Sequence, residues 1–146
     1  MNRARLTSVL VTAVVVATMM ACSEESETCE EEAETAPSPS GATCPAGSPL
    51  TYENFGKPFM EKYCTSCHSS TLRGEEARQC APEGHDFDTE MGILGVASHI
   101  DWLAASGPTA TNTEMPPSGA KPTLQEREQL GEWLACVRSG GATDGG

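Results

Sequence analysis

Basic side chains and aromatic side chains are both scarce in this 146-residue sequence. It contains 9 Lys and Arg residues against 21 Asp and Glu residues, and aromatic residues make up 5% of the chain. Proteins that bind nucleic acid present a basic face to the phosphates, so the charge balance predicts no nucleic-acid partner. The few aromatic residues leave a small domain with a modest hydrophobic core of its own. An apolar cofactor in the core would supply the missing bulk.

The sequence patterns that mark common catalytic sites are also missing. The chain shows no evident pair of catalytic carboxylates, no Ser-His-Asp set and no Gly-rich phosphate-binding loop. These patterns supply the acid, the nucleophile or the phosphate cradle on which many reactions depend. We therefore expect that the chain is not an enzyme.

The longest apolar stretch lies at the N-terminus, directly after two basic residues. Arg3 and Arg5 precede a mostly apolar run from Val9 to Met20, which is too short for a confident membrane span. The run ends at Ala21-Cys22, which resembles a bacterial lipoprotein cleavage site, where the Cys becomes the lipidated first residue. We expect a signal peptide at 1–21 and a periplasmic chain anchored to a membrane through lipid on Cys22. Ordinary secretory cleavage and an uncleaved anchor are the alternatives, and both also place the chain outside the cytoplasm.

The stretch after this site is acidic at first and then rich in Pro, Ser and Gly. Seven glutamates fall between positions 24 and 34. Such a block repels itself and stays solvated, and the residues that follow have the composition of a linker. We expect a tether at 22–47, a folded domain at 48–140 and a disordered tail at 141–146. A docking tail for a basic partner is the alternative use of the acidic block.

The stretch Cys64-Thr65-Ser66-Cys67-His68 has the C-x-x-C-H spacing of a c-type haem attachment site. Two thiols one helical turn apart can each add to a vinyl group of the porphyrin, and the His that follows can bind the iron. A C-x-x-C pair can also be half of a zinc site or a redox dithiol. The chain has no second C-x-x-C, no closely spaced His pair and no βαβ pattern around the motif. We therefore predict that Cys64 and Cys67 hold one covalent haem c and that His68 binds its iron.

Four further cysteines, Cys29, Cys44, Cys80 and Cys136, allow three disulfide connectivities. An exported chain enters an oxidising compartment, in which such bridges form and persist. We favour Cys44 with Cys136, because this bridge would join the start of the domain to its last helix. Cys29 with Cys80 follows from that choice.

Helix caps and hydrophobic spacing predict three helices in the domain. The first follows Thr51 or Asn54, which are both good N-caps, and carries an aromatic stripe that ends just before the haem motif. The second covers residues 96–105, and the last begins at a capping box at 123–126 and runs to about 137. Residues 69–91 follow no period and are expected to be irregular.

With these features the chain resembles a class I single-haem cytochrome c over residues 50–140. The likeness rests on the haem motif, the helix before it, Met115-Pro116-Pro117 before the last helix, and Trp133-Leu134 within that helix. The resemblance implies an all-α fold of three to four helices around one covalently bound haem. In that family a Met that follows the haem motif is the second axial ligand of the iron, and Met115 lies 47 residues after His68.

The resemblance also assigns roles to residues around the haem. The family places a Gly eight residues before the first haem Cys, where it packs against the last helix. Gly56 occupies that position, and Gly131 is its expected partner. The family's Pro carbonyl that accepts the Nδ1–H of the proximal His is placed at Pro82. His85 and His99 are the rival iron ligands if Met115 does not bind.

Electron transfer is the function that this resemblance implies. The protein would be a membrane-tethered carrier whose iron cycles between Fe(III) and Fe(II), with redox proteins as its partners. A haem-based sensor or a peroxidase-like enzyme with an open iron position is the alternative. A structural lipoprotein with an accidental C-x-x-C-H motif is the third possibility.

Overall fold

The computed structural model describes Cys29 and residues 38–140, and the regular elements within these residues are helices. The helical segments are η1 (Tyr52–Gly56), α1 (Lys57–Tyr63), α2 (Gly74–Arg78), α3 (Glu90–Gly95), α4 (Ala97–Ala104) and α5 (Leu124–Arg138). The described part contains no strand and one isolated bridge, between Ser106 and Thr111. The expected all-α class is therefore confirmed. None of the described helices is both long enough and apolar enough to cross a membrane.

The first helix begins at Thr51, as expected, and runs through the π-helical turn η1 into α1. Thr51 and Asn54 form a capping box, in which the Thr51 N–H donates to Asn54 Oδ1 at 2.8 Å and the Asn54 N–H donates to Thr51 Oγ1 at 3.1 Å. The aromatic stripe is confirmed, with ring centroids 5.5 Å apart for Phe55 and Phe59 and 5.0 Å apart for Phe59 and Tyr63. This stripe directs the start of the haem motif toward the core.

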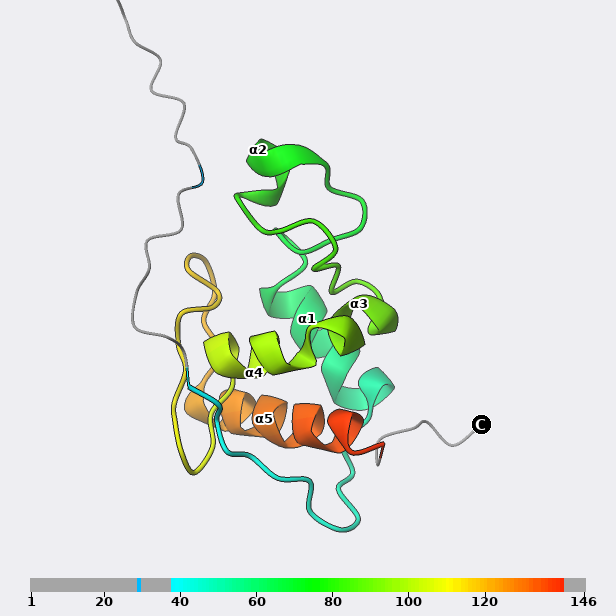
Figure 1. Cartoon of the computed structure of the whole chain (residues 1–146), viewed down its shortest axis with the longest axis vertical. Helices are drawn as coiled ribbons and strands as arrows, with labels where there is room; N and C mark the ends of the chain where they lie inside the picture. The colour runs from blue at the N-terminus through cyan, green and yellow to red at the C-terminus, as the bar shows by residue number, and fades with distance from the viewer. Residues whose placement is uncertain (1–28, 30–37, 141–146) are drawn as a thin grey trace, which may run out of the picture.

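The second and last predicted helices correspond to α4 and α5, which lie side by side (Figure 1). The capping box at the start of α5 is confirmed, because the Glu126 N–H donates to Thr123 Oγ1 at 3.2 Å and the Thr123 N–H donates to Glu126 Oε2 at 2.8 Å. The fully buried Leu130 and Leu134 of α5 share one core cluster with residues of α4 and α1. The turn η1 packs against α5, and α3 contacts α4.

A glycine permits the close approach of the first and last helices. A Cβ atom on Gly56 would lie 2.2 Å from Cζ2 of Trp133, which is buried on α5. Gly56 therefore packs against the last helix, as the resemblance implies. The expectation that Gly131 is the partner of Gly56 is wrong. A Cβ on Gly131 would instead lie 2.6 Å from the Ser106 carbonyl oxygen and 2.9 Å from the Ala42 Cβ. Gly131 makes room for the N-terminal segment rather than for η1.

Residues 38–42, which the sequence places in the expected tether, make hydrogen bonds with α4 and with the loop that follows it. The buried Ser40 donates its N–H to Asp101 Oδ2 at 3.0 Å and its hydroxyl to Asp101 Oδ1 at 2.5 Å. Its carbonyl accepts the Thr109 N–H at 2.9 Å, and the Ser38 carbonyl accepts from Asn112 Nδ2 at 2.9 Å. We call residues 38–42 the strap, because they bind α4 to the loop that follows it.

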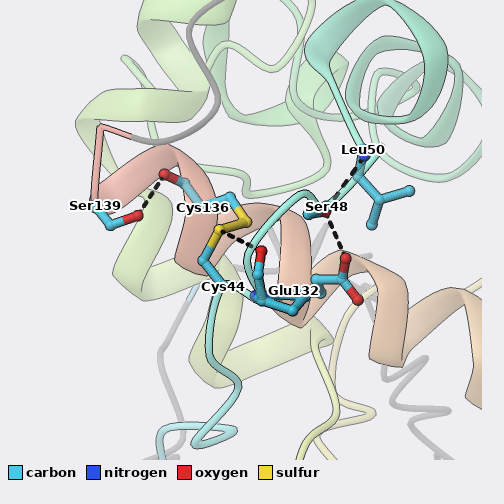
Figure 2. The surroundings of a disulfide bond; sticks show 7 residues. Cys44, Ser48, Leu50, Glu132, Cys136 and Ser139 are labelled. Carbon is cyan, nitrogen blue, oxygen red and sulfur yellow. Dashed lines mark hydrogen bonds between the residues drawn. A yellow bond between two sulfur atoms is a disulfide. The ribbon is translucent and has the colours of Figure 1, made fainter.

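Both favoured disulfides are present, Cys44–Cys136 and Cys29–Cys80. Figure 2 shows Cys44 joined to Cys136 on α5, beside the hydrogen bond of 2.5 Å from Ser48 Oγ to Glu132 Oε1. Two disulfides are compatible with an exported protein. The expected signal peptide at 1–21, the lipidation site Cys22, the glutamate-rich part of the tether and the tail at 141–146 lie outside the described residues.

Candidate functional site

The two motif cysteines lie on one helical turn that continues from α1. The Cys64 N–H donates to the Met60 carbonyl at 2.8 Å, and the N–H groups of Cys67 and His68 donate to the Cys64 carbonyl at 3.1 and 2.9 Å. Cys64 and Cys67 are both half-buried and unpaired, whereas the other described cysteines form disulfides. The fold thus keeps two thiols available, one turn apart and directly before a His.

The environment of Cys64 suppresses thiolate formation. Burial raises the pKa of the Cys64 thiol to about 12, and the Arg127 guanidinium only partly opposes this rise. Reactive cysteines of redox dithiols have lowered pKa values, since the thiolate is the nucleophile. A protonated thiol at neutral pH therefore argues against the redox-dithiol interpretation of the motif.

His68 is held by an aromatic stack and has an unused ring nitrogen. Its ring lies on that of Phe87, with centroids 4.4 Å apart and an interplanar angle of 11°, and the Phe87 N–H donates to the His68 carbonyl at 2.9 Å. Nδ1 is buried without a hydrogen-bond partner, which is uncommon for a buried polar atom. Burial lowers the pKa of His68 to about 4. The imidazole is therefore neutral at pH 7, which is the form that binds a metal.

The expected hydrogen bond from His68 Nδ1 to the Pro82 carbonyl is absent from the structure. The Pro82 carbonyl accepts from Arg78 Nη2 at 2.6 Å and from the His85 N–H at 3.3 Å. The Pro82 carbonyl is therefore held by the buried Arg78, and His68 Nδ1 makes no hydrogen bond to it. The sequence does not predict the burial of Arg78, because this residue lies in a stretch of charged residues without an apolar pattern.

Arg78 organises the whole segment that follows the motif. Its side chain is 1% exposed, donates to the Ser69 carbonyl at 2.8 Å and pairs with Asp86 at 2.9 Å. The expectation that 69–91 is irregular is correct for most of the segment, although α2 and the start of α3 lie within it. The segment is fixed to the motif through Ser69 and Phe87 and covers one face of His68.

The two rival ligands, His85 and His99, lie in one cluster of rings with His68. The ring centroid of His85 is 6.1 Å from that of His68, and that of His99 is 5.2 Å from that of His85. Within 38–140 and Cys29, no three His, Cys, Asp or Glu side chains are placed to hold a metal ion together. The three histidines form an aromatic cluster with Phe87, not a metal cage.

Met115 is half-buried and packs against the same core cluster as Cys64. Its N–H donates to the Leu103 carbonyl at 2.9 Å, and its carbonyl accepts from Arg127 Nη1 at 2.9 Å. Both polar groups of the Met115 backbone are therefore fixed, one by the end of α4 and the other by α5. The sequence indicates Met115 as a candidate ligand, but no sequence feature indicates that Arg127 holds its backbone.

Two cavities of about 270 and 310 Å³ lie beside the disulfides, and neither is lined by a residue of the haem motif or by Met115. A haem at the motif would occupy neither of them.

The donor set nevertheless fits a c-type haem. Cys64 and Cys67 offer two free thiols at the required spacing, His68 offers a neutral imidazole, and Met115 offers a thioether beside the same core as Cys64. Soft sulfur and neutral imidazole are the axial ligands of electron-transfer haems. No protein-family model, no curated protein and no solved structure matches this chain.

Proposed function

We propose that this protein is a membrane-tethered, single-haem c-type cytochrome that carries electrons outside the cytoplasm. The observation that carries the proposal is the pair of free thiols, Cys64 and Cys67, directly before the neutral, half-buried His68. In a chain whose other described cysteines are paired, these two remain free. The function gives a reason for this, because the thiols are needed for covalent attachment.

Each residue of the site has a distinct role in this proposal. Cys64 and Cys67 would hold the porphyrin as thioethers, each S–H adding across one vinyl group. His68 and Met115 would bind the two axial positions of the iron, and when bound the haem supplies a one-electron Fe(III)/Fe(II) couple. A thioether favours Fe(II), so Met115 would raise the reduction potential. Phe87 shields one face of His68 from water.

The fixed backbone around Met115 supports electron transfer over ligand chemistry. A carrier needs both axial positions filled in both oxidation states, so that little rearranges when an electron moves. The hydrogen bonds from Met115 to Leu103 and from Arg127 to Met115 restrain the ligand loop. A sensor or a peroxidase-like enzyme would need this Met to stay away from the iron.

Haem staining of matched cysteine variants tests the attachment. The full chain is co-expressed with a haem-attachment system and run on a denaturing gel. We expect wild type and a Cys44→Ser, Cys136→Ser control to retain stain, and Cys64→Ser with Cys67→Ser to lose it. An unstained wild-type band, or equal stain in all three, would contradict the proposal.

A further inference from the structure

Arg127 is a buried cation at the junction of three chain segments. It is the fourth residue of α5 and only 3% exposed. Its Nη1 donates to the carbonyls of Ala104 at 2.7 Å, Asn112 at 2.9 Å and Met115 at 2.9 Å. One nitrogen therefore joins the last helix to the end of α4 and to two points of the Met115 loop.

Arg127 has no acidic partner among the described residues. The ion pairs within Cys29 and 38–140 are Lys62–Glu126, Arg78–Asp86 and Arg138–Asp101. A buried charge is costly unless hydrogen bonds replace its lost hydration. Here backbone carbonyls alone provide that replacement. An apolar side chain would fill the same space at lower cost, so the guanidinium is needed for its donors.

The carbonyls that Arg127 binds are those that determine where Met115 lies. Met115 is attached to α4 through its N–H and to α5 through its carbonyl, and Asn112 is bound three residues earlier. Asn112 is in turn held by its own Nδ2, which donates to the Asp101 carbonyl at 3.0 Å. Loss of the guanidinium would free the loop on the side that faces α5.

We propose that Arg127 is the positioning residue of the iron-ligand loop. Its hydrogen bonds to the Asn112 and Met115 carbonyls hold this loop against α5, so that the thioether would stay on the iron. This inference rests on the proposed function, because it presupposes a haem that Met115 binds. Arg127 itself touches neither iron nor porphyrin in this account and acts only through the loop.

Competition by added imidazole measures how firmly Met115 is held. Imidazole can bind haem iron only when Met115 has left, so its apparent dissociation constant reports the population of the open form. Hydrogen bonds from a charged donor correspond to a factor of about 10 to 100 in such a population. We expect Arg127→Leu to bind imidazole more tightly by about that factor and to lose part of the near-infrared sulfur-to-iron band.

Arg138→Leu is the control, since Arg138 is a cation on the same helix whose partner is Asp101, at 3.9 Å, and not the Met115 loop. It should leave the imidazole affinity near that of wild type. Arg127→Lys keeps the charge on a shorter side chain, and should give an intermediate affinity. If Arg127→Leu yields no haem protein, Arg127→Lys carries the test alone.

The outcomes separate this inference from the proposed function. Wild type with haem, with the sulfur band and with the expected order of affinities supports both. Equal imidazole affinities for wild type and the Arg127 variants, or equal gains for Arg127→Leu and Arg138→Leu, overturn the positioning role and leave the cytochrome intact. A wild type without haem, or one whose imidazole affinity Met115→Ala does not change, overturns the ligand assignment and the positioning role with it.

Discussion

Single residues at the contact between the first and last helices set how closely these helices pack. A Gly56→Ala change would add a Cβ atom 2.2 Å from Cζ2 of Trp133, and Trp133 is itself only 1% exposed. Overpacking of this kind costs about 1–3 kcal/mol of unfolding free energy, more than the helix-propensity gain of Ala over Gly. We therefore expect urea unfolding of the haem-loaded protein to shift to lower urea in Gly56→Ala.

Gly95→Ala is the control for this substitution. Gly95 is also helical, but a Cβ there meets no atom within 4 Å. We expect this variant to be unchanged or slightly more stable. A Gly56→Ala protein as stable as Gly95→Ala would show that the contact between Gly56 and Trp133 is not tight in solution.

Glu126 makes stability depend on pH at the start of α5. The Thr123 N–H, the Tyr63 hydroxyl, the Thr123 hydroxyl and Lys62 lower the pKa of Glu126 to about 2. Because the pKa of the folded state lies below the ordinary value of 4.5, the stabilisation is complete above that value and is lost as the pH falls toward 2. We expect Glu126→Gln to lower the free energy of unfolding by about 1 kcal/mol at pH 7. This difference from wild type should vanish as the pH falls to about 2.

Unfolding curves measured between neutral and strongly acidic pH test this prediction. Glu128→Gln, which changes an exposed glutamate on the same helix, is the control and should follow wild type throughout. A Glu126→Gln deficit that stays constant as the solution is acidified would mean that the carboxylate is not held in its ionised form.

At the scale of elements, the strap connects α4 to the loop that carries Met115. Ser40 gives two hydrogen bonds to the buried Asp101, and its carbonyl accepts the Thr109 N–H. Ser40→Ala removes the hydroxyl and leaves Asp101 Oδ1 without that donor, which costs about 1.5–3 kcal/mol for a charged acceptor. We expect a lower unfolding midpoint and faster amide hydrogen exchange at Thr109.

Ser98→Ala is the control, because Ser98 is exposed on the same helix as Asp101. It should change neither the midpoint nor the exchange at Thr109. If Ser40→Ala behaves in the same way as Ser98→Ala, residues 38–42 do not form the strap in solution.

The elements themselves could be predicted wherever the determinants are local. Thr51 and Thr123 begin helices because each forms a capping box with a residue three positions later. The candidate site residues Cys64, Cys67 and His68 come from a local motif, whereas Met115 comes from the resemblance, and all four stay predictions. The disulfide pairing was also foreseen, because only one pairing joins the start of the domain to its last helix.

Long-range contacts were not predictable in this way. Arg78 and Arg127 are buried because backbone carbonyls from several segments accept hydrogen bonds from them. Their neighbours in the sequence do not indicate this burial. Gly131 was assigned to the wrong partner, since helix crossing positions depend on packing between distant elements. The strap has the composition of a linker, and hydrogen bonds to the distant residues Asp101 and Asn112 hold it in place.

At the scale of the whole molecule, the disulfide between Cys29 and Cys80 shortens any tether to a membrane. Only the stretch from Cys22 to Cys29 could then separate a lipid from the folded domain. Its seven Cα–Cα steps span at most about 25 Å, so the folded domain would stay close to the membrane surface. We expect wild type to pellet with membranes and Cys22→Ser to remain soluble with its haem. Equal soluble fractions for the two proteins would rule out the lipid anchor.

The presence of covalent haem is the central claim for the molecule as a whole. Its most direct test is the intact mass of the wild-type chain, produced with a haem-attachment system and measured after denaturation and acetone extraction. We predict the polypeptide mass plus one haem, because two thioether bonds at Cys64 and Cys67 survive both treatments. A mass equal to that of the polypeptide alone would contradict the account.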